Sequence, residues 1–352
     1  MRNPLAEDLD HVLARTGGLW EELRGARVFR TGGTGFFGCW LLETLLWAND
    51  RLGLDASVVV LTRQPAAFAG KAAALASHPA LTLQSGDVRT FDIDQGAFSH
   101  VIHAGTETAA PVTAADSLAV VDSIVGGTRR VLDLARRSGA RRFLLTSTGA
   151  VYGRQPADIT HLSEEYMGGP DTTNPARAGA EAKRAAEMLC AIYADRRLQP
   201  TIARCFAFVG PYLPLDAHLA VGNFIRDALR GGPIDVAGDG SPQRSYLYAG
   251  DLAVWLWTVL LRGQPMRPYN VGSETAISIG ELARAVAGRF APGAEIRFAR
   301  TPDSATPVDR YVPSTARIRT ELGVTTTVEL DEALARTASW HRERGAMSHV
   351  AN

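Results

Sequence analysis

The sequence predicts an α/β fold, in which a doubly wound parallel sheet of the Rossmann type carries a smaller, interleaved C-terminal domain. Three observations support this prediction. Short apolar runs rich in β-branched residues alternate with helical patterns through the first half of the chain. A glycine-rich turn at residues 31–38 lies between the first apolar run and the first long helical pattern. After about residue 208, proline and glycine divide the chain into shorter segments, which indicates a second unit.

Strands are expected where apolar side chains follow one another without a polar face. These runs occupy residues 27–31, 57–62, 81–84, 100–103, 142–147 and 201–206. Strands that are apolar on both faces are typical of parallel sheets covered on both sides. Right-handed crossovers between them give the doubly wound arrangement.

Helices are expected where apolar residues recur every three or four positions. The patterns cover residues 37–49, 117–138 and 178–194, and residues 254–261 are apolar enough to form a buried helix. An amphipathic helix precedes the first strand, with Leu5, Leu9, Val12 and Leu13 at helical spacing. We therefore divide the chain into an N-terminal helical extension (1–25), a Rossmann domain (26–208) and a smaller domain (209–345), with segments around 245–275 returning to the Rossmann domain.

The composition excludes several classes of protein. The 352 residues are 46% hydrophobic, and 37 basic residues balance 37 acidic ones. A neutral chain without a basic stripe is not expected to bind nucleic acid. No run reaches the roughly 20 apolar residues of a membrane span, and no signal-peptide core is evident, so we expect a cytoplasmic protein. The three cysteines, Cys39, Cys190 and Cys205, suggest no metal site or disulfide.

The glycine-rich turn predicts a dinucleotide site. Gly32 allows the tight turn, Gly35 lets the backbone approach a pyrophosphate, and Gly38 lets the following helix pack on the sheet. The amides near the start of that helix would bind the phosphate charge, so the predicted contacts also include Thr34, Phe36 and Phe37. The alternative is a purely structural turn. The strand before the turn and the helix after it favour the dinucleotide.

The end of the second strand bears on which cofactor binds. An acid there would bind the adenosine ribose, whereas a base would pair with a 2′-phosphate. The sequence reads Leu-Thr-Arg-Gln-Pro over residues 61–65, so Arg63 favours NADP over NAD, unless it is a solvated surface arginine. Asp87 and Val88 follow the third strand and are expected beside the adenine, although Asp87 could be a turn residue.

These residues resemble the extended short-chain dehydrogenase/reductase family, in its nucleotide-sugar epimerase/dehydratase branch. The likeness runs from about residue 27 to residue 340. It is carried by the segments 31–38, 86–88, 101–104, 146–153, 183–187, 204–211, 238–244 and 269–272, together with Asp251. The resemblance implies a C-terminal domain that binds a nucleoside-diphosphate sugar. It also implies hydride transfer to a nicotinamide, with His103, Ala104, Gly105, Lys183 and Phe206 at the cofactor.

The family's catalytic set is a Ser or Thr together with a Tyr-x-x-x-Lys pair. A free tyrosine has a pKa of about 10, and a nearby lysine ammonium and the nicotinamide cation lower that pKa so that the phenolate can act as base. Thr148 matches the hydroxyl residue and Lys183 matches the lysine. The tyrosine position is occupied by Gly179.

Four interpretations of Gly179 remain open. Another base could act, with Tyr166, Glu164, Glu165, His161 and Glu181 as candidates; of these we favour Glu181 and Tyr166. The chemistry could begin otherwise than by alcohol oxidation, the protein could bind without catalysis, or the glycine could be a deliberate substitution. Arg30, a charge late in the first strand, is a further oddity.

The residues after Thr148 narrow the reaction. By resemblance, dehydratases and decarboxylases carry carboxylates at this point, whereas this chain has Gly149 and Ala150. We therefore expect an epimerase or ketoreductase. A non-redox lyase or isomerase, or a cofactor-binding protein, is the alternative.

The resemblance also assigns a substrate site and an assembly. Arg244 and Arg310 would grip the substrate diphosphate, unless they are surface arginines. Asn223 is expected to open a helix, either as its N-cap or as a phosphate or sugar ligand. By resemblance, an asparagine is frequent in the family at the position of Ala207. His218 is explained equally well as a ligand and as a loop residue. Family members often dimerise through helices corresponding to residues 117–138 and 178–194, so a homodimer is expected.

Overall fold

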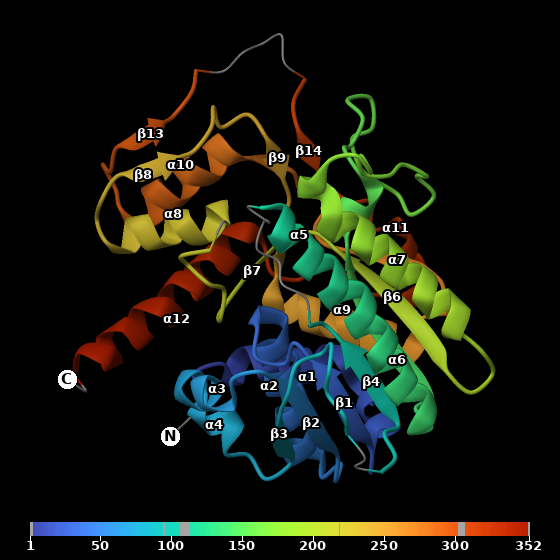
Figure 1. Cartoon of the computed structure of the whole chain (residues 1–352). Coiled ribbons are helices and arrows are strands. Elements are labelled where there is room, and N and C mark those ends of the chain that lie inside the picture. Colours follow the sequence, from blue (N-terminus) through green and yellow to red (C-terminus); the bar gives the residue numbers. More distant parts are fainter. Residues whose placement is uncertain (1–2, 94–95, 106–112, 218, 302–306, 351–352) are drawn as a thin grey trace.

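A seven-stranded parallel sheet forms the centre of the molecule (Figure 1). The computed structural model describes residues 3–93, 96–105, 113–217, 219–301 and 307–350. The strand order is β11-β6-β5-β4-β1-β2-β3, so the order reverses between β1 and β4. Ligands of doubly wound folds bind at the carboxyl ends of the strands beside such a reversal. The strands are β1 (Arg27–Thr31), β2 (Ser57–Thr62), β3 (Leu81–Ser85), β4 (His100–His103), β5 (Arg142–Thr148), β6 (Gln199–Cys205) and β11 (Pro268–Val271).

The six strands expected from the sequence are confirmed to within two residues. Successive residues on one strand point to opposite faces of the sheet, and both faces are buried here. On β4, Ile102 belongs to one core cluster while Val101 belongs to the other. On β5, Leu144 and Phe143 divide in the same way. This explains why neighbouring positions in the middle of these strands are both apolar.

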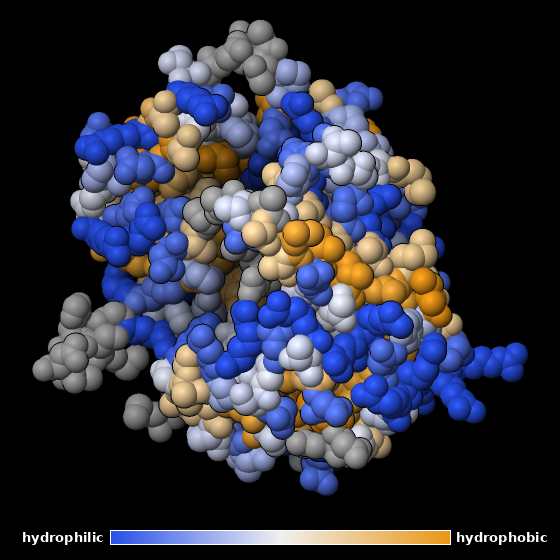
Figure 2. Space-filling model, viewed as in Figure 1, coloured by the Kyte–Doolittle hydropathy of each residue, from blue (hydrophilic) through white to orange (hydrophobic). Residues whose placement is uncertain are grey.

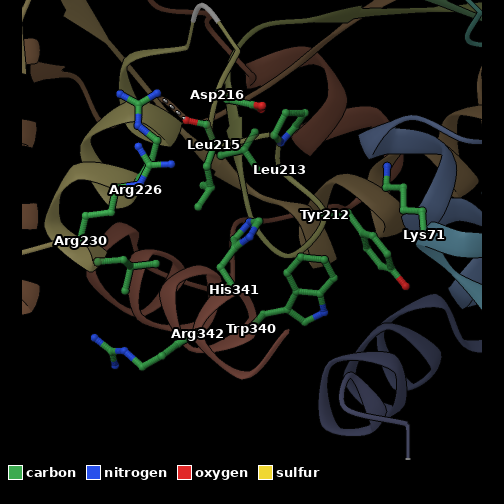
Figure 3. A pocket seen from close by; sticks show the side chains of 12 residues that line it. Lys71, Tyr212, Leu213, Leu215, Asp216, Arg226, Arg230, Trp340, His341 and Arg342 are labelled. Atoms are coloured by element: carbon green, nitrogen blue, oxygen red, sulfur yellow. Dashed lines mark hydrogen bonds between the residues drawn. The ribbon is translucent and has the colours of Figure 1, made fainter. Parts of the chain in front are cut away.

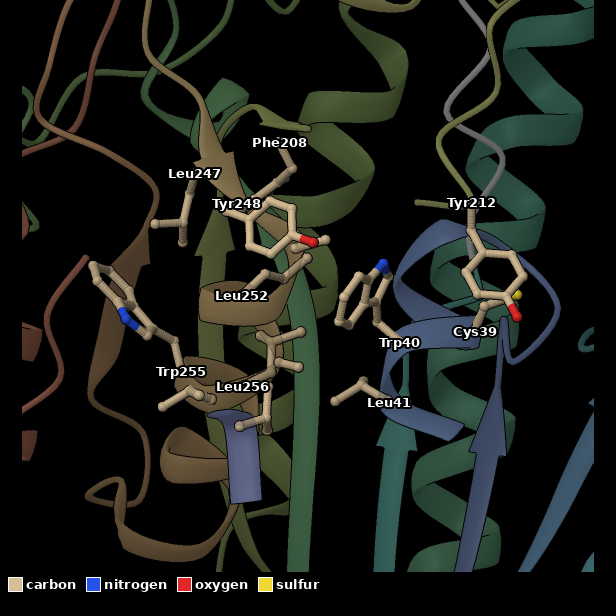
Figure 4. Close-up of a cluster of buried hydrophobic side chains, with 14 of the residues drawn as sticks. Cys39, Trp40, Leu41, Phe208, Tyr212, Leu247, Tyr248, Leu252, Trp255 and Leu256 are labelled. Carbon is tan, nitrogen blue, oxygen red and sulfur yellow. The ribbon is translucent and has the colours of Figure 1, made fainter. Parts of the chain in front are cut away.

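One face of the sheet is covered by α2 (Phe36–Leu52) and α9 (Ala249–Arg262). Every residue of α9 from Ala249 to Leu261 is buried, which confirms the expected buried helix. The edge of the Tyr248 ring packs on Trp40 with 5.7 Å between ring centroids (Figure 4). The N-terminal helix α1 (Ala6–Thr16) packs against α2 and α9 with Leu5, Leu9 and Val12 buried, as its pattern predicts.

The other face is covered by α5 (Ala114–Val121), α6 (Gly127–Arg137) and α7 (Ala178–Tyr193). The single helix expected over residues 117–138 is instead two helices joined by one π-helical turn, Asp122–Gly126. A π turn inserts one residue into a helix, and a hydrophobic pattern alone does not reveal it. The short helices α3 (Pro65–Lys71) and α4 (Ala73–Ala76) lie between β2 and β3.

The later part of the chain forms small sheets and helices above the carboxyl ends of the strands (Figure 1). Three two-residue strands form one sheet in the order β12-β9-β14. These elements are β7 (Phe208–Val209), α8 (Ala220–Leu229), β8 (Ile234–Val236), β9 (Gln243–Arg244), β10 (Leu247–Tyr248), β12 (Ile277–Ser278), α10 (Ile279–Phe290), β13 (Ile296–Phe298), β14 (Arg310–Tyr311), α11 (Ala316–Leu322) and α12 (Leu330–Val350). β11 returns to the large sheet and pairs with β6.

Among the described residues, no helix is both long enough and apolar enough to cross a membrane. Within the same part of the chain, no group of three or more His, Cys, Asp or Glu side chains is arranged to hold a metal ion. Cys39, Cys190 and Cys205 are free and buried, and each packs as a small apolar side chain.

Candidate active site

The turn between β1 and α2 leaves no room for a side chain at Gly32 or at Gly38. Gly32 has a φ of +65°, and a Cβ atom there would lie 2.4 Å from the carbonyl oxygen of Ala104. A Cβ atom on Gly38 would lie 2.3 Å from the carbonyl oxygen of Gly32. At Gly35 the nearest atom would be 3.7 Å away, so that position is open toward the cleft. The three glycines therefore have the different requirements that a dinucleotide turn imposes.

The start of α2 fits a phosphate group. The helix begins at Phe36, and its N-cap residue, Gly35, offers no side chain to bond the first amides. Those amides lack carbonyl partners within the helix and carry its positive dipole end. Lys71 places its ammonium 3.0 Å from the carbonyl oxygen of Thr34 and adds positive charge beside the turn. The turn residues Thr34, Phe36 and Phe37 thus lie where a cofactor pyrophosphate would be held.

Arg30 is explained by its position next to the same turn. The side chain is buried, and its Nη1 atom donates to the carbonyl oxygen of Gly38 at 3.1 Å. Its Nε and Nη2 atoms have no hydrogen-bond partner among the described residues. Burial lowers the pKa of Arg30 to about 10. A buried cation with unused donors beside the turn favours an anion there.

The end of β4 is bonded to the turn. His103 is fully buried, with Nδ1 2.7 Å from the Thr31 hydroxyl and Nε2 3.0 Å from the Thr128 hydroxyl. Burial lowers the pKa of His103 to about 3, so the ring is neutral at ordinary pH. The amide of Gly105 donates to the Thr31 hydroxyl at 3.0 Å. These bonds fix Ala104 and Gly105 against the turn.

The residues expected at the adenosine follow β2 and β3. Arg63 is exposed directly after β2. Asp87 accepts two hydrogen bonds from the guanidinium of Arg89, each 2.9 Å, and these bonds lower the pKa of Asp87 to about 2. Val88 packs against Gly127, where a Cβ atom would lie 2.9 Å from it. The Asp87 carboxylate is therefore engaged within its own turn.

Lys183 and Thr148 come from two elements that contact each other, α7 and β5. Lys183 is buried on α7, and its ammonium donates to the carbonyl oxygen of Thr146 at 2.5 Å. Burial lowers the pKa of Lys183 to about 8. Thr148 ends β5, and its hydroxyl accepts from the amide of Ala150 at 3.2 Å. Gly179 lies one helical turn before Lys183 and so on the same face of α7.

The two favoured substitute bases lie elsewhere in this arrangement. Glu181 is two residues from Lys183, which turns it about 200° around the helix, and its carboxylate is 3.7 Å from the guanidinium of Arg184. Tyr166 is half-buried, and its ring lies 6.3 Å from the ring of Tyr152, centroid to centroid. The structure does not bring the side chain of either residue to the Thr148 hydroxyl.

The other three candidates have structural partners. Glu164 is buried and accepts from the amide of Asn270 at 2.7 Å. Glu165 forms an ion pair with Arg317. His161 is exposed, with Nε2 3.0 Å from the carbonyl oxygen of Glu274.

The side chain that does reach Thr148 is Tyr311. Its hydroxyl lies 3.3 Å from the Thr148 hydroxyl and 3.4 Å from the carbonyl oxygen of Cys205. Burial raises the pKa of Tyr311 to about 12. Sequence reasoning missed this residue, although it follows Arg310, which the family resemblance had placed at the substrate.

Phe206 closes the wall beside Thr148. Its ring packs against that of Tyr311 with 4.6 Å between centroids and 36° between the ring planes. A Cβ atom on Gly149 would lie 2.6 Å from the Phe206 ring. The aromatic ring therefore fills the space into which a side chain at position 149 would project, so a carboxylate there would require the ring to move.

Two of the three substrate candidates, Arg244 and Arg310, lie on paired strands of the β12-β9-β14 sheet, where Arg310 lies opposite Gln243. Arg244 places Nη2 2.7 Å from the carboxylate of Asp309. Arg310 donates from Nε to the side-chain oxygen of Gln243 at 3.0 Å. In the pairing of β14 with β9, Tyr311 lies opposite Arg244. The sheet thus joins a candidate diphosphate ligand to the hydroxyl near Thr148.

Asn223 does not open a helix, contrary to expectation. The helix α8 begins at Ala220, and Leu219 is its N-cap residue. Asn223 lies in the first turn, and its side-chain oxygen accepts from Arg226 at 3.2 Å. The N-cap interpretation of Asn223 is therefore wrong. Ala207 is half-buried beside Phe206, and His218 lies outside the described residues.

A separate pocket of about 770 Å³ opens between α8, α12 and the end of α3 (Figure 3). Its wall includes Lys71, Arg230, Trp340 and His341. Lys71 also contacts the carbonyl oxygen of Thr34, so the pocket adjoins the glycine turn. None of the candidate catalytic or substrate residues lines it.

Comparison with known proteins bears on this geometry. Residues 28–272 match the NAD dependent epimerase/dehydratase family. The chain is 30% identical to UDP-glucuronic acid decarboxylase 2 of Arabidopsis thaliana, over 97% of this chain and 75% of that protein. UDP-glucuronic acid decarboxylase 3 of the same plant is 31% identical over 88% of this chain and 86% of its own length.

Solved structures share the architecture. A dTDP-glucose 4,6-dehydratase from Streptomyces venezuelae, solved with NAD bound, has a TM-score of 0.76 at 25% identity and covers 91% of this chain and 98% of its own. A UDP-glucuronic acid 4-epimerase from Bacillus cereus, solved with UDP-glucuronic acid and NAD, also has a TM-score of 0.76. It is 20% identical and covers 90% of this chain and 99% of its own.

Proposed function

The chain belongs to the NAD-dependent epimerase/dehydratase family, and from this premise we propose that it is a nucleotide-sugar oxidoreductase or epimerase. The observation that carries the proposal is the placement of the glycine turn and Lys183 on one sheet. The turn follows β1, and Lys183 bonds the end of β5. Gly32 and Gly38 exclude side chains from the turn, and Lys183 is buried two strands away beside β5. When bound, the nicotinamide supplies or accepts hydride.

The chain's own residues hold and orient the reactants. The α2 amides and Lys71 bind the cofactor phosphates, and Lys183 contacts the nicotinamide-side ribose. Thr148 holds the oxygen of the reacting sugar carbon. Arg244 and Arg310 bind the diphosphate of a nucleoside-diphosphate sugar, because a guanidinium fork suits phosphate oxygens. The curated relatives act on UDP-glucuronic acid by name, so we propose a UDP-sugar as the first substrate class to test.

The proposed reaction eliminates neither water nor carbon dioxide. Elimination of water or carbon dioxide at a neighbouring carbon would use a carboxylate after Thr148, as the family resemblance implies. Gly149 takes that position, and the Phe206 ring fills the space above it. Ketone reduction or epimerisation requires only the hydride and one proton relay. A non-redox role for the cofactor is the second candidate, because Gly179 replaces the usual phenol.

For the cofactor we propose a preference for NADP. Arg63 is exposed at the end of β2, where a guanidinium can form a fork with a 2′-phosphate. The preference is tested by comparing the binding of NADP⁺ and NAD⁺ to the wild-type protein and to Arg63→Ala. We expect Arg63→Ala to bind NADP⁺ more weakly than the wild-type protein does, and to bind NAD⁺ equally well. Equal loss for both nucleotides would contradict the proposal.

We also propose a homodimer formed through α5 and α7. Leu118 on α5 and Met188 and Ile192 on α7 are 68%, 62% and 66% exposed. Figure 2 shows apolar surface running over these helices. Contiguous exposed apolar side chains indicate an interaction surface. Light scattering should give a dimer for the wild-type protein and a monomer for the double variant Met188→Glu, Ile192→Glu.

The enzymatic proposal is tested by following deuterium. Reduced cofactor labelled with deuterium at the nicotinamide C4 position is incubated with two 4-keto sugars, UDP- and dTDP-4-keto-6-deoxyglucose. In parallel, oxidised cofactor is incubated with UDP-glucuronic acid and UDP-glucose, where reduced nicotinamide forms only if a sugar alcohol is oxidised. We expect label to pass to at least one sugar, with a change in absorbance at 340 nm for a net reduction. Cofactor binding without any transfer would favour the non-redox candidate. Gly179→Tyr should increase transfer if that position once supplied a base.

A further inference from the structure

The hydroxyl of a half-buried tyrosine from the C-terminal domain lies at the threonine of the candidate active site. The Tyr311 hydroxyl is 3.3 Å from the Thr148 hydroxyl. Gly179, which stands where the family phenol would project, carries no side chain. The side chains of the other candidate bases all have other partners or face elsewhere: Tyr166, Glu164, Glu165, His161 and Glu181.

We propose that Tyr311 is the proton donor to the substrate oxygen held at Thr148, in place of the phenol that position 179 lacks. This inference rests on the proposed function and deepens it, because it assigns the acid and the direction of the reaction.

The fold holds Tyr311 at this place from two sides. β14 pairs with β9, so that Tyr311 lies opposite Arg244. The tilted ring of Tyr311 packs against Phe206 at 4.6 Å between centroids. The adjacent residue, Arg310, is fixed by hydrogen bonds to Gln243 and to the carbonyl oxygen of Ala157. The pairing therefore places the proposed acid opposite one candidate diphosphate ligand, Arg244, and directly after the other, Arg310.

The proton step balances in the reducing direction. Hydride from the reduced nicotinamide forms a C–H bond at the carbonyl carbon, and the π pair of the C=O bond moves to the oxygen. The O–H bond of Tyr311 breaks and its proton passes to that oxygen. The ketone becomes an alcohol and the nicotinamide is oxidised. The Tyr311 phenolate then accepts a hydrogen bond from Thr148 and regains a proton from water.

The charges around Tyr311 favour an acid over a resting base. Burial raises the pKa of Tyr311, and the neighbouring Cys205 on β6 acts in the same direction. The Thr148 hydroxyl and the Arg244 guanidinium on β9 lower that pKa and would stabilise the phenolate once it forms. The phenol is thus protonated at neutral pH. Reduction of a keto sugar fits this resting state better than oxidation of an alcohol.

The first test is the loss of one oxygen atom. Tyr311→Phe keeps the ring that packs against Phe206 and removes only the hydroxyl. With UDP- and dTDP-4-keto-6-deoxyglucose, we expect the rate of deuterium transfer to fall about 10²–10⁴-fold. Tyr193→Phe is the matched control, because its hydroxyl bonds Asp133, and it should stay within about threefold of the wild-type rate. Transfer by Tyr311→Phe within threefold of wild type would overturn the inference.

The second test uses no turnover. Ionisation of tyrosine is followed by absorbance at 295 nm in wild type and Tyr311→Phe, with and without saturating oxidised cofactor. A nearby nicotinamide cation should lower the pKa of one phenol by about 1 pH unit or more, and Tyr311→Phe should lack that change. The same change in both proteins would assign it to another tyrosine, such as Tyr166, and overturn the inference. Failure of wild type to bind either cofactor would instead overturn the proposed function, and this inference with it.

Discussion

The guanidinium of Arg30 donates a hydrogen bond of 3.1 Å to the carbonyl oxygen of Gly38, at the point where the glycine turn enters α2. The charge is fully buried, and two of its nitrogens lack partners among the described residues. A buried charge without a counter-ion is costly. An anion bound at the turn would compensate the charge of Arg30 and would explain why the side chain is buried.

Arg30→Met should therefore separate stability from binding. Methionine fills similar volume without charge, so we expect the free protein to unfold at higher denaturant concentration, with a gain of about 1–3 kcal/mol. Binding of the oxidised cofactor should weaken about tenfold or more, because one charge near the phosphate is lost. Denaturant unfolding and calorimetry measure the two effects. A variant that is less stable and binds normally would contradict this account of Arg30.

Two glycines of the turn provide a matched pair. Gly38→Ala places a Cβ atom 2.3 Å from backbone, whereas at Gly35 the nearest atom is 3.7 Å away. We expect Gly38→Ala to lower the free energy of unfolding by several kcal/mol, about 3 or more. Gly35→Ala should fold normally and bind cofactor about 10–100-fold more weakly, because the methyl group would meet the pyrophosphate. If both variants bound cofactor normally, the phosphate would not lie at this turn.

Two buried histidines predict sensitivity to acid. Burial lowers the pKa of His100 to about 4 and that of His103 to about 3. In the unfolded chain each histidine has a pKa of about 6.5. As the pH decreases, the unfolded chain therefore binds protons before the folded protein does, and acid favours unfolding. Stability should be intact above pH 6.5 and fall by about 1.4 kcal/mol per pH unit for each histidine as the pH decreases toward 4.

His100 allows this prediction to be checked away from the cofactor. The ring bonds the Ser99 hydroxyl through Nδ1 at 2.9 Å. His100→Asn keeps a polar atom near that position, and its unfolding free energy should fall less steeply with acid, by about one proton. Unfolding curves between pH 7 and pH 4.5 measure the slope. An unchanged slope would mean that burial of His100 does not determine the acid dependence.

Gly179 is not required by packing. A Cβ atom there would lie 3.6 Å from Val120, which is ordinary contact, and no positive φ restricts the position. Gly179→Ala should therefore stabilise the protein by about 0.5–1 kcal/mol, as expected for alanine in place of glycine within a helix. Thermal unfolding tests this. Destabilisation would show that the glycine has a structural role.

The sheet could be predicted because its information is local. Most strands of β1 to β6 contain a short apolar core, such as Val58–Leu61 in β2 and Phe143–Leu145 in β5, and the helices between them have a 3.6-residue period. The relation of Gly179 to Lys183 follows from helical spacing alone. The π turn at Asp122–Gly126 was missed because one inserted residue barely changes an apolar pattern.

Tyr311 could not be predicted in the same way. β14 has two residues, and it pairs with a strand 67 positions earlier in the chain. Two residues carry no periodicity, and their partner is set by the packing of the whole C-terminal domain. Arg30 likewise looked misplaced in a buried strand until its contact with Gly38 was known. The helix α8 also begins at Ala220, three residues before Asn223, and its N-cap residue Leu219 forms no side-chain capping bond.

Calorimetric titration of the purified protein with NAD⁺ and with NADP⁺ tests the central claim most directly. Our account predicts that at least one of them binds with a stoichiometry of one per chain, and that Gly35→Ala weakens this binding while circular dichroism shows an unchanged fold. No heat of binding for either nucleotide, from protein shown to be folded, would contradict it.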